Sequence, residues 1–155
     1  MNLAHVHLLL NHIPVLGTFF GLLLLIIAMV RKSEELKKAS LGTFIVVALL
    51  AIPTYLTGDP AEKIVKDLPG VSKPLIEQHD DAATASLTAL SILGVASLAG
   101  LFFMRRSRPS PPWFVLVLLG LSIITAGMMA WTANLGGQIR HSEVRSSAVS
   151  SSHLE

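Results

Sequence analysis

The sequence predicts an all-α membrane protein, a four-transmembrane-helix bundle made of two αα hairpins. Two observations lead to this fold class. The 155 residues are 52% hydrophobic and only 14% charged, whereas a soluble domain usually carries about 25% charged residues. The charges also lie in short clusters between four long apolar runs, and each run is long enough to cross a hydrocarbon layer roughly 30 Å thick.

The four predicted spans are joined by links of unequal length. The spans cover residues 8–30, 39–57, 82–104 and 113–135. In the first span, the Gly17-x-x-x-Gly21 spacing predicts a close approach of a neighbouring helix. Pro14 removes one backbone donor, so we expect the Leu10 carbonyl to lack its usual helical partner. The membrane domain is expected to occupy residues 1–145, and the polar tail over 146–155 is expected to be disordered.

The longest link, residues 58–81, is expected to cap one end of the bundle. It begins at the turn sequence Thr57-Gly58-Asp59-Pro60. Residues 60–68 predict a short amphipathic helix, and residues 73–81 predict a second short helical piece. At the other end of the chain, the double glycine that follows Leu135 predicts the end of the fourth span.

The distribution of basic residues predicts the orientation in the membrane. The links after the first and third spans are short and hold Arg31, Lys32, Lys37, Lys38, Arg105, Arg106 and Arg108. Short cytoplasmic loops are enriched in Lys and Arg, so these two links are expected inside the cell. In a bacterium, this orientation predicts a multi-pass protein of the inner membrane with both termini in the periplasm.

Several classes of protein are excluded by composition. The chain has no cysteine, which excludes disulfides, thiolate metal sites, iron–sulfur clusters and covalent c-type haem. No basic run is long enough to indicate a nucleic-acid partner. The first residues lack the positive charge and the cleavage site of a signal peptide, so the first apolar run is expected to be a retained helix.

Histidine is concentrated on the predicted outer side. Five of the six histidines flank the spans there, namely His5, His7, His12, His79 and His141. Imidazole is a common ligand of iron, copper and zinc. On a regular helix, His5 and His12 would lie about 10 Å apart along the axis, and His7 and His12 would point about 140° apart. These three histidines therefore serve different ligand pairs, or His5-x-His7 chelates from an extended segment.

A haem site is the leading functional hypothesis. A bis-histidine b-type haem takes one imidazole from each of two facing helices. The two halves of the chain form a weak repeat, with a histidine before the first helix, a basic loop, and a glycine after the second helix. This repeat suggests His12 with His79 as one axial pair and His7 with His141 as a second. The hypothesis is a cytochrome b-like electron-transfer protein with its site near the outer face.

Two alternatives stay open. A non-haem site for iron, copper or zinc would use His5, His7, His12, His79, Glu77 and Asp80, with the carboxylates completing the shell. A structural subunit of a respiratory membrane complex would use its histidines only for hydrogen bonds. No residue is singled out as catalytic, and an electron carrier or binding protein is favoured over a stand-alone enzyme. Expected partners are the lipid bilayer and a periplasmic cytochrome or respiratory complex, and a homodimer stays open.

The opening of the first span resembles a known bacterial family. His7-x4-His12-x-Pro14 is similar to the His-Pro-x-x-x-His-Phe-Pro opening of the membrane proteins called domain of unknown function 2231. Leu135-Gly136-Gly137 resembles the family's Gly-Gly ending. Leu8 stands where the family has its first proline, and His141 lies closer to the double glycine than the family's trailing histidine. Members are small four-helix membrane proteins, some fused or adjacent to cytochrome c-like modules, so the resemblance implies a haem-binding or redox setting.

Overall fold

The structure is a computed structural model that describes residues 2–104 and 110–140. The described part contains helices and no strands, which confirms the all-α class. The helices are α1 (Leu3–Leu10), α2 (His12–Val30), α3 (Glu34–Leu56), α4 (Gly58–Val65), α5 (Lys73–Met104) and α6 (Pro112–Arg140). His141, the loop residues Arg105, Arg106 and Arg108, and the tail over 146–155 lie outside the described residues.

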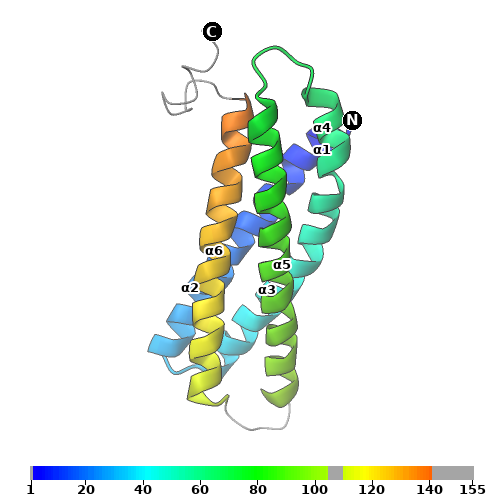
Figure 1. The fold of residues 1–155 in the computed structure, drawn as a ribbon. Coiled ribbons are helices and arrows are strands. Elements are labelled where there is room, and N and C mark those ends of the chain that lie inside the picture. The colour runs from blue at the N-terminus through cyan, green and yellow to red at the C-terminus, as the bar shows by residue number, and fades with distance from the viewer. Residues whose placement is uncertain (1, 105–109, 141–155) are drawn as a thin grey trace.

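Four long rods form the predicted bundle (Figure 1). Helix α1 continues into α2 as the first rod and α3 into α4 as the second, while α5 and α6 are the other two. The rods pack in a closed ring, because α2 contacts α3 and α6, and α5 also contacts α3 and α6. Within the described residues, all four rods are long and apolar enough to cross a membrane.

The first rod begins earlier than predicted and breaks at Asn11. Helix α1 starts at Leu3 because the side chain of Asn2 accepts the backbone N–H of His5 at 2.9 Å. Pro14 lacks the N–H that would bond to the Leu10 carbonyl. The Thr54 hydroxyl of α3 lies 3.5 Å from that carbonyl, but its shorter hydrogen bond, at 3.0 Å, is to the Leu50 carbonyl of its own helix.

The non-helical part of the predicted cap over residues 58–81 is short in the structure. Helix α4 covers its first part, and a short link over residues 66–72 includes Gly70, whose φ of 79° favours glycine. The expected second short piece over residues 73–81 is not separate, because α5 runs unbroken from Lys73 to Met104. Pro74 lies in the first turn, where a missing N–H costs nothing, and no helix-breaking residue follows it before the predicted span.

The prediction that α6 ends before Gly136 is wrong. The helix continues through both glycines to Arg140. An isolated glycine weakens a helix by only about 1 kcal/mol, and the contacts of Gly136 with a neighbouring helix, described below, account for its presence. Helix α3 likewise begins five residues before the predicted span, at Glu34, because the Ser33 hydroxyl accepts the Leu36 N–H at 3.3 Å.

The bundle core is filled by large apolar side chains and narrowed by glycines. Leu25, Phe44, Leu90, Leu93 and Leu118 are almost completely buried. A Cβ atom added to Gly21 would lie 2.6 Å from Cε1 of Phe44, and one added to Gly17 would lie 2.5 Å from Cγ2 of Val47. These glycines therefore allow α2 and α3 to pack closely, as their spacing predicts.

The outer surface of the bundle is apolar along most of its length. In each rod, the most apolar 18-residue window is only 28–33% buried, and large side chains such as Leu16, Val95 and Ile124 are exposed. Such a surface is far larger than the apolar patches of soluble monomers. Figure 1 also shows that the α2–α3 link lies at the end of the bundle opposite the start of the chain.

Candidate functional site

The four described histidines on the predicted outer side lie at one end of the bundle, which we call the histidine end. This end carries α1, α4, the first turns of α5 and the last turns of α6 (Figure 1). His5 and His12 are exposed, whereas His7 and His79 are half-buried. The two half-buried rings come from different hairpins, His7 from the first and His79 from the second.

Hydrogen bonds hold the His7 ring at the junction between α3 and α4. Its Nδ1 lies 3.0 Å from the Thr54 carbonyl oxygen and 3.1 Å from the Thr57 hydroxyl. The Thr57 hydroxyl donates to the same carbonyl at 2.7 Å. A Cβ atom added to Gly58 would lie 3.9 Å from Cε1 of the His7 ring, so the ring also packs beside the backbone of Gly58.

His79 is fixed in the same way in the second hairpin. Its Nδ1 lies 3.0 Å from the Thr132 carbonyl oxygen of α6. The Thr132 hydroxyl bonds to the Ser86 hydroxyl of α5 at 2.9 Å. A Cβ atom added to Gly136 would lie only 3.1 Å from Cε1 and 3.4 Å from Nδ1 of His79, so the imidazole occupies the space that a side chain at residue 136 would need.

The two arrangements repeat one motif. In each hairpin, a histidine of the first rod bonds to the carbonyl of a threonine in the second rod, four residues before a glycine that faces the ring. The sequences are Thr54-x-x-x-Gly58 and Thr132-x-x-x-Gly136. By these contacts the counterpart of His79 in the repeat is His7. The expected haem-ligand pairing of His12 with His79 stays a prediction.

The hydrogen bonds determine the tautomer of both rings. A carbonyl oxygen only accepts, so Nδ1 of His7 and of His79 must each carry a proton. In a neutral imidazole, Nε2 then keeps its lone pair. Within the described part of the chain, Nε2 of neither ring has a hydrogen-bond partner. Both rings thus have the protonation pattern of a metal-ligating histidine, in which the N–H of the other ring nitrogen donates to a carbonyl.

The two rings are held by equivalent contacts in the two hairpins. The hydrogen bonds to Thr54 and Thr132 hold each ring within its own hairpin. The histidine end thus presents a pair of oriented imidazoles, one from each half of the chain.

Among the described residues, the other predicted ligands make no hydrogen bond to this pair, although Asp80 directly follows His79 in α5. The ring of His12 donates from Nδ1 to the Leu8 carbonyl of its own rod at 3.1 Å. His5, Glu77 and Asp80 are exposed, and His141 is outside the described residues. Within residues 2–104 and 110–140, no three or more His, Cys, Asp or Glu side chains are grouped closely enough to hold a metal ion.

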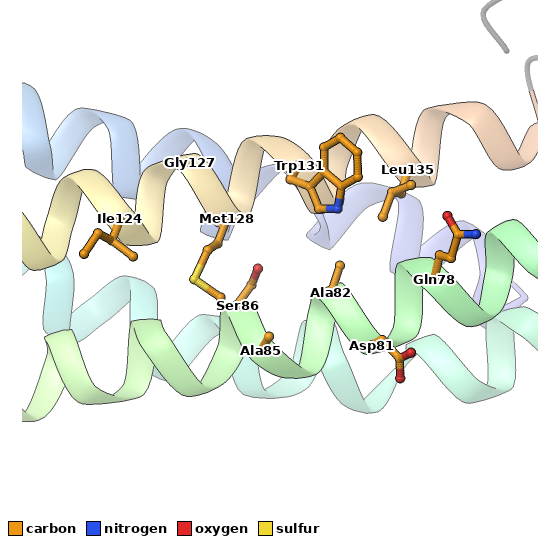
Figure 2. Close-up of a pocket in the computed structure, with 10 residues that line it drawn as sticks. All are labelled: Gln78, Asp81, Ala82, Ala85, Ser86, Ile124, Gly127, Met128, Trp131 and Leu135. Atoms are coloured by element: carbon orange, nitrogen blue, oxygen red, sulfur yellow. The ribbon is translucent and has the colours of Figure 1, made fainter. Parts of the chain in front are cut away.

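A groove lies between α5 and α6 beside the His79 motif (Figure 2). Its volume is about 670 Å³, and it is lined by Gln78, Asp81, Ala82, Ala85, Ser86, Ile124, Gly127, Met128, Trp131 and Leu135. Ser86 belongs to both features, because its hydroxyl bonds to Thr132. The groove was not expected from the sequence, since its lining resembles ordinary helix surface.

A scan against protein-family models gives no match, and neither do searches of curated proteins and of solved structures. The threonine residues of the site were not predicted from the sequence. The shared Thr-x-x-x-Gly spacing at the ends of α3 and α6 was the available signal.

Proposed function

We propose that the protein binds haem in a membrane and transfers electrons, and that His7 and His79 would hold the haem iron. The observation that carries this proposal is the pair of imidazoles from different hairpins, each donating Nδ1–H to a threonine carbonyl at 3.0 Å. Because Nδ1 carries the proton, Nε2 of each ring keeps its lone pair and would be the atom that ligates iron.

The donor set favours haem over a bare metal ion. A protein-bound zinc ion usually takes four ligands, and the described residues offer no group of three histidines or acids that could begin such a shell. A porphyrin supplies four nitrogens of its own and needs only two axial ligands. Two neutral imidazoles, which no third His, Cys, Asp or Glu of the described residues joins in a metal-binding group, therefore fit a haem better than an iron, copper or zinc ion.

The residues around the rings have separate roles in this proposal. The carbonyls of Thr54 and Thr132 hold the Nδ1 protons and fix the ring planes. Gly58 of α4 and Gly136 of α6 leave room for the rings, because neither has a side chain. A bound haem would supply one-electron chemistry, cycling between the ferric and ferrous states. The resemblance to the four-helix family supports a periplasmic cytochrome or a respiratory complex as the redox partner.

The proposal also requires insertion in a membrane. Four rods that are long and apolar, with windows only 28–33% buried, support insertion across a bilayer. The positive charge of the α2–α3 link supports a cytoplasmic position for that end. The histidine end would then face the periplasm of a bacterial inner membrane, with both termini on that side.

Cysteine labelling tests insertion and orientation, because the native chain has no cysteine. Glu35 lies at the start of α3 and Glu77 at the histidine end, and both are exposed. We expect Glu77→Cys to react with an impermeant maleimide in intact spheroplasts. Glu35→Cys should react only after the membrane is permeabilised. The opposite pattern would invert the orientation, and equal labelling of both residues in intact cells would contradict insertion.

Visible spectroscopy tests haem binding. We expect the protein purified in detergent and mixed with haemin to give the oxidised and dithionite-reduced spectra of a six-coordinate, bis-histidine b-type haem. His7→Ala and His79→Ala should each lower haem affinity roughly tenfold or more and abolish the six-coordinate spectrum. His12→Ala is the matched control, because His12 is exposed and bonds only within its own rod.

Two further results separate ligation from misfolding. Added imidazole should restore the six-coordinate spectrum of His79→Gly, because the free ligand enters the space of the missing ring. Circular dichroism should show unchanged helical content in every variant. A wild-type protein that binds no haemin, or a His12→Ala variant that loses haem as completely as His79→Ala, would contradict the proposed ligand pair.

A further inference from the structure

The groove between α5 and α6 has the form of a channel open to the side of the bundle. Figure 2 shows Trp131, Met128 and Ile124 extending from α6 along one wall, with Ala82 and Ala85 of α5 on the other. Ile124 and Trp131 are 60% exposed, so the groove is on the outer surface and not in the core. In a membrane, this surface would face lipid.

Small residues keep the groove open. Gly127 lies between Ile124 and Trp131 on the same face of α6, and a Cβ atom added to Gly127 would meet nothing within 4 Å. On α5, Ala85 and Ala82 line the groove opposite Met128 and Trp131 (Figure 2). Large residues at these positions would fill the space, as the leucines do in the bundle core.

The polar groups of the groove are gathered at the histidine end. Gln78 and Asp81 are exposed there, while the Ser86 hydroxyl is buried and engaged with Thr132. Among the described residues, the Asp81 carboxylate has no ion-pair partner. The groove is therefore apolar along its length and carries an unpaired negative charge at its outer end.

The length of the groove matches one leaflet of a bilayer. Its α6 wall runs from Ile124 to Leu135, which is about 16 Å at 1.5 Å per residue. Half of a hydrocarbon layer is about 15 Å. Trp131 lies near the outer end, where an indole is favoured at the membrane interface. An acyl chain of the outer leaflet would thus run along the groove with its headgroup at the level of Asp81.

We infer that the α5–α6 groove binds one bilayer lipid whose headgroup carries a primary ammonium. The acyl chain packs over Gly127 between Trp131 and the alanines of α5, and the ammonium donates hydrogen bonds to the Asp81 carboxylate. A quaternary ammonium has no N–H to donate, and an anionic headgroup would be repelled by Asp81. This inference rests on the proposed membrane insertion and not on haem binding.

The test compares lipids that differ only in their headgroups. The protein is purified in mild detergent from vesicles of phosphatidylethanolamine, phosphatidylcholine and phosphatidylglycerol in equal amounts with identical acyl chains. Native mass spectrometry then counts the lipids retained by each protein. We expect one phosphatidylethanolamine per chain, in roughly fivefold excess over phosphatidylcholine, and least phosphatidylglycerol. Asp81→Asn should remove this excess while keeping a retained lipid.

Two glycine variants test whether the groove itself holds the chain. Gly127→Leu fills the groove and should abolish lipid retention. Gly120→Leu is the matched control, because Gly120 is also an exposed glycine of α6 with open space around it but does not line the groove. Both variants should keep the haem spectrum of the wild type, so that a failure here is distinct from a failure of haem binding.

Three outcomes would overturn the inference. Equal retention of the three lipids by the wild type would show that Asp81 selects no headgroup. A Gly127→Leu protein that retains lipid as well as Gly120→Leu would show that the lipid lies elsewhere. A wild-type dimer without retained lipid, converted to a monomer by Gly127→Leu, would make the groove an interface between two copies of the chain.

Discussion

Gly136→Leu is expected to displace the His79 ring and to lower haem affinity about 10–100-fold, the range for losing a group that orients a metal ligand. Even the Cβ atom of the new side chain would lie 3.1 Å from Cε1 and 3.4 Å from Nδ1 of His79. The ring cannot move away without breaking its 3.0 Å hydrogen bond to the Thr132 carbonyl. We also expect a loss of stability of about 3 kcal/mol from the overpacking and the lost hydrogen bond.

The neighbouring glycine provides the control for this variant. Gly137 is exposed, and a Cβ atom there would meet nothing within 4 Å. Gly137→Leu makes the same change in helix propensity one position along α6 without reaching His79. Haemin titration and denaturant unfolding in detergent measure the two effects. If Gly136→Leu and Gly137→Leu have equal haem affinity and equal stability, the packing of His79 against Gly136 is not what orients the ring.

Gly21→Leu is expected to destabilise the bundle by about 3 kcal/mol or more, because it overpacks a site with no free space. An added Cβ atom would lie 2.6 Å from Cε1 and 2.8 Å from Cδ1 of Phe44, and the Phe44 ring is completely buried. The Gly21 carbonyl also accepts the buried Ser40 hydroxyl at 2.8 Å. Separating α2 from α3 would leave that hydroxyl without its partner, at a cost of about 1–3 kcal/mol.

The control for Gly21 lies on the facing helix. Gly42 belongs to α3, and a Cβ atom there would meet nothing within 4 Å. Gly42→Leu should therefore leave stability almost unchanged, within about 0.5 kcal/mol. Unfolding in detergent, followed by circular dichroism, compares the two variants. A Gly21→Leu protein as stable as Gly42→Leu would mean that α2 and α3 do not pack as closely as these distances require.

The sequence predicted the bundle well because the hydrophobicity and charge of each residue are known without knowing its contacts. Four apolar runs and short links such as the one after Val30 require antiparallel neighbours, whatever the details of packing. The same reasoning brought the described histidines to one end, since each flanks an end of a span on the same side. The structure has all four rods, and His5, His7, His12 and His79 lie at the histidine end.

The helix ends were predicted less well because local signals compete with tertiary contacts. A double glycine usually marks a helix end, but Gly136 lies inside α6 with the His79 ring against it. The polar residues before the third span suggested a separate piece, but α5 begins at Lys73. In both cases, continuing the helix satisfies the backbone donors and acceptors, and the sequence signal was too weak to oppose it.

The sequence alone determined the four long apolar helices, their two hairpins and the end at which the described histidines lie. Only the tertiary structure decided which histidines bond to the carbonyl of a neighbouring helix. His7 and His12 are five residues apart and point to different sides of a helix, so the direction of the first rod after its break at Asn11 decides which ring turns inward. That direction depends on contacts with residues far along the chain, Thr54 above all, because an inward ring needs a carbonyl that only another helix can supply.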